Sequence, residues 1–235
     1  MTSDHEYRGN LRYAVDIVLC VDVTESMAPV LDTVKKSALT FHERLSLVMG
    51  GKGKEISRLR LKVIAFRDFG DFAEDAIEET EFLVFPERAA DFDRFVRELH
   101  ATGGGDVPES GLEALALAIN ADWERGLDRR RHVIVMFTDA PAHPLRAPQA
   151  VTAHTYPQGI PRDLDGLFEQ WGYAKSQTAV MENAAKRLVL FAPDAYPWTE
   201  ITEEWNMTLH FPSVAGQGLA ELELDEIIDT IANSL

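Results

Sequence analysis

Short apolar runs alternate with longer amphipathic segments along nearly the whole chain. The apolar runs are typical of buried strands, and they cover residues 15–21, 59–66, 81–85, 132–137, 188–191 and 208–211. The amphipathic segments repeat apolar residues every three or four positions, which predicts helices at 26–48, 89–100, 112–123, 164–187 with a break near Gly172, 198–205 and 222–235. This alternation predicts a doubly wound α/β fold, with about six strands in a mainly parallel central sheet and helices on both faces.

The chain reads as one domain spanning residues 13–235, preceded by a polar tail of residues 1–12. No internal repeat, low-complexity tract or linker interrupts the pattern. The longest irregular segment is 141–161, which contains five of the 11 prolines. A loop of this kind usually lies over a site or is mobile, so we expect it near the functional face.

The charge and composition of the chain indicate which partners and which cellular compartment to expect. The formal net charge is −16, which argues against a nucleic-acid-binding protein because such proteins carry a basic face. No stretch approaches the roughly 20 apolar residues that span a bilayer, so no membrane contact is expected. The N-terminus lacks a secretory signal, and the single cysteine, Cys20, fits a reducing compartment. These features predict a cytoplasmic protein. Its oligomeric state stays open.

Oxygen-bearing side chains follow the first buried strand. Asp22, Thr24 and Ser26 occupy alternate positions in the turn from this strand into a helix. Hard divalent cations prefer oxygen ligands, and alternate residues of a tight turn can direct three oxygens towards one point. The same residue types also cap helix N-termini, so this segment alone favours neither interpretation.

Two further aspartates extend the pattern. Asp139 ends another apolar strand, and Asp106 lies in the glycine-rich loop 103–110. Ligands of open α/β sheets bind beyond the carboxyl ends of the strands. The ordered set Asp-x-Thr-x-Ser, Gly-Gly-Gly-Asp-x-Pro-Glu and Thr-Asp-Ala-Pro resembles the bacterial and alpha-kinase-associated branch of von Willebrand factor A (vWA) domains, across roughly residues 13–235.

The resemblance implies a metal-ion-dependent adhesion site that holds Mg²⁺, or Mn²⁺ or Ca²⁺. It implies hydroxyl ligands from Thr24 and Ser26, and direct or water-mediated ligation by Asp22 and Asp139. Asp106 stands where the family usually has a threonine, although Thr102 is an alternative for that position. An aspartate there adds negative charge, so we expect a ligand reaching this metal to depend less on a carboxylate than in adhesion receptors.

Three side chains near these motifs stay secondary candidates. Arg67 and Asp68 follow the second strand, where a strand-end salt bridge is the favoured role. His143 follows Asp139 closely, and we expect it to support the site or pack in the loop, because a hard cation prefers oxygen to nitrogen.

The function implied by the resemblance is a non-catalytic, metal-dependent protein-interaction module, acting as an adaptor or regulator in a bacterial multi-protein system. Its partner would be a protein contacting the metal face. One alternative is a metal-dependent phosphohydrolase, but Thr24 stands where one large phosphatase family needs a second aspartate, and the phosphate-loop and nucleophile-elbow motifs are absent from the sequence. Another alternative is a vWA scaffold that binds no metal.

Overall fold

The computed structural model describes residues 11–71, 73–104, 108–125, 129–173, 179–213 and 229. Its centre is a sheet of seven strands, six of which follow the order β3-β2-β1-β5-β6-β7, while β4 pairs with β2. The strands are β1 (Leu11–Asp22), β2 (Lys54–Phe66), β3 (Ile77–Glu79), β4 (Leu83–Phe85), β5 (Arg130–Phe137), β6 (Lys186–Pro193) and β7 (Thr208–Ser213). The pairs β1–β2, β1–β5, β5–β6 and β6–β7 are parallel, whereas β3 and β4 run antiparallel to β2. The expected mainly parallel sheet is confirmed.

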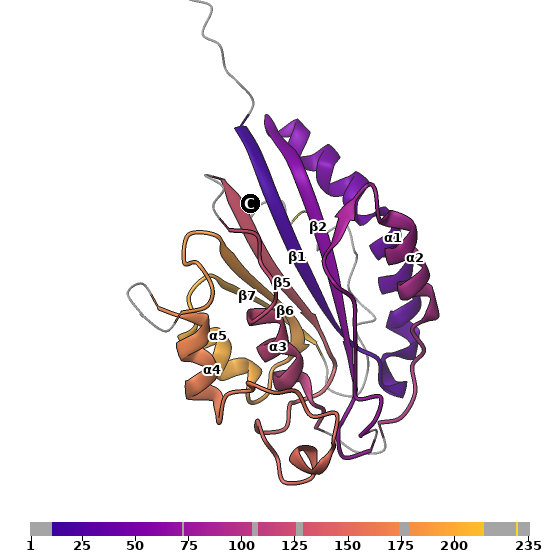
Figure 1. Ribbon diagram of the computed structural model, residues 1–235, viewed down its shortest axis with the longest axis vertical. Helices are drawn as coiled ribbons and strands as arrows, with labels where there is room; N and C mark the ends of the chain where they lie inside the picture. The colour runs from indigo at the N-terminus through magenta and orange to yellow at the C-terminus, as the bar shows by residue number, and fades with distance from the viewer. Residues whose placement is uncertain are drawn as a thin grey trace, which may run out of the picture.

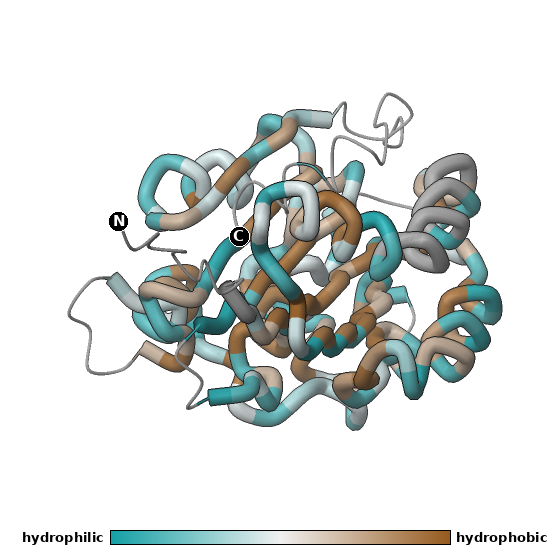
Figure 2. Tube along the Cα trace, turned by 90° about the horizontal axis from the view of Figure 1, so that it is seen from above, coloured by the Kyte–Doolittle hydropathy of each residue, from teal (hydrophilic) through white to brown (hydrophobic). Residues whose placement is uncertain are grey.

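Helices cover both faces of this sheet (Figure 1). On one face lie α1 (Ala28–Gly51) and α2 (Ala89–Glu98), and on the other lie α3 (Gly111–Ile119), α4 (Leu164–Trp171) and α5 (Trp198–Glu204). Two 3₁₀ turns complete the elements, η1 (Glu25–Met27) and η2 (Ala150–Thr152). Seen from above, the brown hydrophobic strands lie inside a more polar outer layer of helices and loops (Figure 2).

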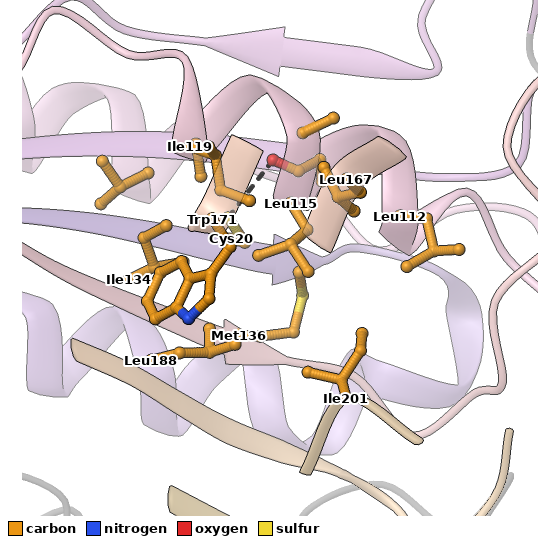
Figure 3. Packing of buried hydrophobic residues seen from close by; sticks show 14 of the residues in the cluster. Cys20, Leu112, Leu115, Ile119, Ile134, Met136, Leu167, Trp171, Leu188 and Ile201 are labelled. Atoms are coloured by element: carbon orange, nitrogen blue, oxygen red, sulfur yellow. Dashed lines mark hydrogen bonds between the residues drawn. The ribbon is translucent and has the colours of Figure 1, made fainter. Parts of the chain in front are cut away.

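The sequence of β1 explains the two layers, because successive side chains of a strand point to opposite faces. Val15, Ile17 and Leu19 pack with the α1 and α2 residues in one core. Val18 and Cys20 pack with α3, α4 and α5 in the other. Figure 3 shows this second core, where the Cys20 thiol donates to the carbonyl oxygen of Ala114 at 3.8 Å. The apolar side chains of β1 therefore contribute to both cores.

Several expected boundaries differ from the structure. The expected helix 164–187 ends at Trp171, because Gly172 has a φ of 81° and residues 179–185 form turns before β6 begins at Lys186. The helix expected at 112–123 ends at Ile119. Strand β3 was not predicted, since it is only three residues long, and β1 begins at Leu11, inside the expected tail. The helix expected at 222–235 falls outside the described residues, apart from residue 229.

Parallel pairing brings the carboxyl ends of β1, β5 and β6 to one edge of the sheet, at the lower end in Figure 1. The loops that follow these strands meet there, as does the irregular segment 141–161. None of the helices described in the structure is long and apolar enough to cross a membrane.

Candidate metal centre

The turn after β1 gathers hydroxyl and amide groups around the carboxylate of Asp22. The Thr24 hydroxyl donates to Asp22 Oδ1 at 2.6 Å, and the Thr24 backbone N–H donates to the same oxygen at 3.0 Å. The Thr24 and Ser26 hydroxyl oxygens lie 3.4 Å apart. Because Asp22 and Thr24 are buried and Ser26 is exposed, the turn leads from the sheet edge to the surface.

The end of β5 meets this turn from the neighbouring strand. The Ser26 hydroxyl donates to Asp139 Oδ1 at 2.9 Å. The Thr138 hydroxyl donates to the second oxygen of Asp22, Oδ2, at 2.7 Å. Four of the five residues predicted as metal ligands therefore lie in one connected cluster, although 113 positions separate Ser26 from Asp139 in the sequence. The contribution of Thr138 was not predicted.

Helix capping does not account for these hydroxyls. Thr24 is the N-cap residue of η1, yet its side chain makes no capping hydrogen bond, and Met27 occupies the N-cap position of α1. The hydroxyls of Thr24 and Ser26 are instead directed at the carboxylates of Asp22 and Asp139. The capping alternative is therefore wrong for both residues.

The start of the glycine-rich loop lies against the same turn. The Thr102 N–H donates to the carbonyl oxygen of Val23 at 3.0 Å, and the Glu25 N–H donates to that of Gly103 at 2.7 Å. Gly104 has a φ of 91°, and a Cβ on it would lie 3.0 Å from the Thr24 Cβ, so a side chain there would press on a candidate ligand. Asp106 falls outside the described residues, so its place among the ligands stays a prediction.

Burial gives the centre unusual electrostatics. Desolvation raises the pKa of Asp22 to about 6, against the opposing effect of the hydrogen bonds from Thr24 and Thr138, and the charge of Asp139 raises it further. Two neighbouring carboxylates buried beside hydroxyl oxygens suit a cation, since a positive charge would stabilise both ionised forms. An all-oxygen donor set is the kind that Mg²⁺, Mn²⁺ and Ca²⁺ prefer.

The side chains that meet in this centre offer oxygen atoms as donors. Within the part of the chain that the structure describes, no group of three His, Cys, Asp or Glu side chains is arranged to hold a metal ion. The candidate centre therefore depends on two carboxylates, two hydroxyls and the contribution expected from Asp106.

The secondary candidates lie beside the cluster and contact other groups. Arg67 forms the expected strand-end salt bridge, with its Nη1 atom 2.8 Å from Glu78 Oε1. Asp68 accepts a hydrogen bond from the Ser110 hydroxyl at 3.0 Å, and its Oδ1 atom lies 3.5 Å from His143 Nε2. Their contacts connect the loops around the centre, and the supporting role of His143 stays a prediction.

A buried tryptophan anchors the end of β5. The Trp198 indole N–H donates to the carbonyl oxygen of Ala140 at 2.9 Å, directly after Asp139. Its ring also lies against Gly111, where a Cβ would come within 3.0 Å of a ring carbon. Trp198 is thus a core residue, and it connects α5 to the end of β5 and to the start of α3.

Known proteins resemble this chain in sequence and in fold. A family model described as a von Willebrand factor A domain matches residues 79–160. This match includes Asp106 and Asp139 but not the turn from Asp22 to Ser26. The alpha-protein kinase vwkA from Dictyostelium discoideum is 29% identical over 150 residues, which cover 64% of this chain and 22% of the kinase chain. The matched part thus spans about a fifth of that relative.

Solved structures support the same fold. The pilus adhesin SpaC from Lactobacillus rhamnosus GG, in its open conformation, aligns with a TM-score of 0.51 and 11% identity, over 94% of this chain and 30% of the adhesin. Proximal thread matrix protein 1 from the mussel byssus aligns with a TM-score of 0.50 and 12% identity, over 96% of this chain and 49% of that protein. At such low identity these likenesses show the fold alone. The family match supports a vWA domain, a type of domain that suggests a protein-interaction module, whereas the solved structures support the fold alone.

Proposed function

We propose that this chain is a non-catalytic, metal-dependent protein-interaction module that acts as a cytoplasmic adaptor or regulator within a multi-protein system. In this proposal Asp22, Thr24, Ser26 and Asp139 hold Mg²⁺, Mn²⁺ or Ca²⁺ through their side-chain oxygens, and Asp106 completes the set. When bound, the cation would supply positive charge and a coordination position for an oxygen of the partner.

The single observation that carries the proposal is the contact between the Ser26 hydroxyl and Asp139 Oδ1 at 2.9 Å. It joins the turn after β1 to the segment after β5, so Ser26 and Asp139 are both placed where they would hold the same cation. The packing of Gly104 on Thr24 supports the same location, because it brings the loop that carries Asp106 to this turn.

The charge of the candidate ligands also affects how a partner would be bound. Asp22 and Asp139 bring two negative charges to the centre, and Asp106 would add a third. A partner carboxylate would then meet less net positive charge than at a centre with fewer acidic ligands. We therefore expect a partner that reaches this metal to depend less on an acidic side chain than in adhesion receptors.

The first prediction is that a bound metal ion raises the thermal stability of the chain. Because a cation that binds the native state stabilises it, Mg²⁺ or Mn²⁺ at about 100 times its dissociation constant should add about 2.7 kcal/mol. For a chain of this size, that corresponds to a rise in melting temperature of roughly 5–10 °C. Thermal melting in EDTA, followed by melting with added metal, measures the shift.

Serine variants provide a matched control. Ser26→Ala removes an exposed candidate ligand and should abolish most of the metal-induced shift, as should Asp139→Asn. Ser57→Ala removes an exposed hydroxyl near the opposite end of the sheet, where Ser57 bonds to the carbonyl oxygen of Tyr13, and should keep the full shift. Absence of any metal effect on the wild-type chain would contradict the proposal, as would an unchanged shift in Ser26→Ala.

A further inference from the structure

Arg67 connects two loops and strand β3 beside the candidate metal centre. Its side chain is only 6% exposed, although it carries a full positive charge. The guanidinium donates to the Thr102 hydroxyl at 3.1 Å and to the His100 carbonyl oxygen at 3.0 Å. It also donates to the Asp75 carbonyl oxygen at 3.0 Å and forms the ion pair with Glu78. The buried guanidinium group of Arg67 thus holds the loop after β2 and the segment after α2 together.

The segment held in this way is the one that contacts the candidate ligands. Thr102, whose hydroxyl accepts from Arg67 Nε, donates its own N–H to Val23 between Asp22 and Thr24. Gly103 accepts the Glu25 N–H, and Gly104 packs on Thr24. A displacement of Thr102 would therefore be transmitted to the turn after β1 by two hydrogen bonds and one close contact.

We propose that Arg67 is a positioning residue for the metal centre, which acts through Thr102 to hold the segment 102–104 against the turn 23–25 and so fixes the geometry of the metal ligands. This inference rests on the proposed function. Partners that orient metal ligands typically contribute ten- to a hundredfold to metal affinity.

The guanidinium shape explains why arginine is needed here. Its planar fork donates to four separate acceptors around Arg67, whereas a lysine ammonium on a flexible stem has three donors and a different geometry. Arg67→Lys keeps the positive charge and most of the side-chain volume. It therefore tests the hydrogen bonds of the planar guanidinium group rather than the charge. Arg60 offers a matched control, because it lies on β2, the strand that Arg67 follows, and forms a bidentate pair with Asp16 in the middle of β1, six residues before Asp22.

The experiment measures the affinity of the full chain for Mn²⁺ from the electron paramagnetic resonance signal of the free ion. Arg67→Lys should weaken binding by about tenfold. Arg60→Lys should lower the melting temperature in EDTA yet leave the Mn²⁺ affinity within about twofold of wild type, since distant sites act independently. This contrast separates positioning of the ligands from a general loss of stability.

Thr102→Val provides a second route, because Thr102 is exposed and its replacement should not prevent folding. It should also weaken Mn²⁺ binding, and adding Arg67→Lys to it should cause little further loss, since both changes break one connection. Wild-type affinity in Arg67→Lys or in Thr102→Val, or fully additive losses in the double variant, would overturn the inference while leaving the proposed function intact. No Mn²⁺ binding by the wild-type chain would overturn both.

Discussion

Replacing Asp16 with alanine is expected to lower the free energy of unfolding by about 3–5 kcal/mol, the usual cost of leaving one partner of a buried ion pair behind. Asp16 is 2% exposed. Arg60 Nε and Nη2 donate to its two oxygens at 2.8 and 2.6 Å, and the Glu124 N–H donates at 2.8 Å. Without Asp16, the guanidinium keeps its place over the Phe82 ring, at 4.5 Å from the ring centroid, with its main counter-charge gone.

Urea unfolding of the variant measures this loss. Asp93→Asn serves as the control, because it breaks the pair between Asp93 and Arg97 on α2, whose side chains are 38% and 63% exposed. Such a surface pair should contribute no more than about 1 kcal/mol. A loss below about 1 kcal/mol in Asp16→Ala would contradict the buried-pair interpretation, since Glu124, whose Oε2 atom lies 3.6 Å from Arg60 Nε, would then suffice as the counter-charge.

The second large effect is a dependence of stability on pH through Glu113. Burial raises the pKa of this carboxyl from 4.5 to about 7 in the folded chain. The folded state therefore retains a proton that the unfolded state releases. The contribution of Glu113 to the free energy of unfolding is fully present below about pH 4.5 and is lost as pH rises through about 7. For a pKa shift of this size, the loss is on the order of 3 kcal/mol.

Glu113→Gln should remove this dependence, because a neutral amide of the same shape can still accept the hydrogen bond that the Tyr156 hydroxyl donates to Glu113 Oε1 at 2.9 Å. The variant should therefore gain stability relative to wild type as pH rises from 5 to 8. Glu98→Gln, at an exposed glutamate, should leave the slope unchanged. Parallel pH profiles for wild type and Glu113→Gln in urea unfolding would contradict the assignment.

The sequence predicted most of the fold because its central strands are mainly apolar segments. β1, β5 and β6 are buried on both faces, so few polar residues interrupt their apolar sequences. The break expected near Gly172 is present, but the helix expected at residues 179–187 was wrong, because tertiary contacts decide the structure of this segment. Lys186 pairs with His132 as β6 begins, and its buried ammonium donates to the Trp171 carbonyl oxygen at 2.8 Å. A lysine at that position gives no sign in the sequence of a buried strand start.

The candidate site was predicted in part for a related reason. Asp22 and Asp139 end apolar strands, and parallel pairing brings such ends together, so their proximity could be foreseen. The contact between Thr138 and Asp22 was not predicted because it depends on the register between β1 and β5. This register places Val21 beside Phe137. The hydrogen bonds of Arg67 could not be predicted for a similar reason. Two of its acceptors are backbone carbonyl oxygens, and a third is the hydroxyl of Thr102, which is distant in sequence.

The most direct test of the metal-dependent module is the number of Mn²⁺ ions bound per chain at saturation, measured by equilibrium dialysis at neutral pH. The proposal predicts one ion per wild-type chain and a large loss of binding in Asp139→Asn, with Asp93→Asn unchanged. Binding of no ion by the wild-type chain, or of one ion with equal affinity by Asp139→Asn, would contradict it.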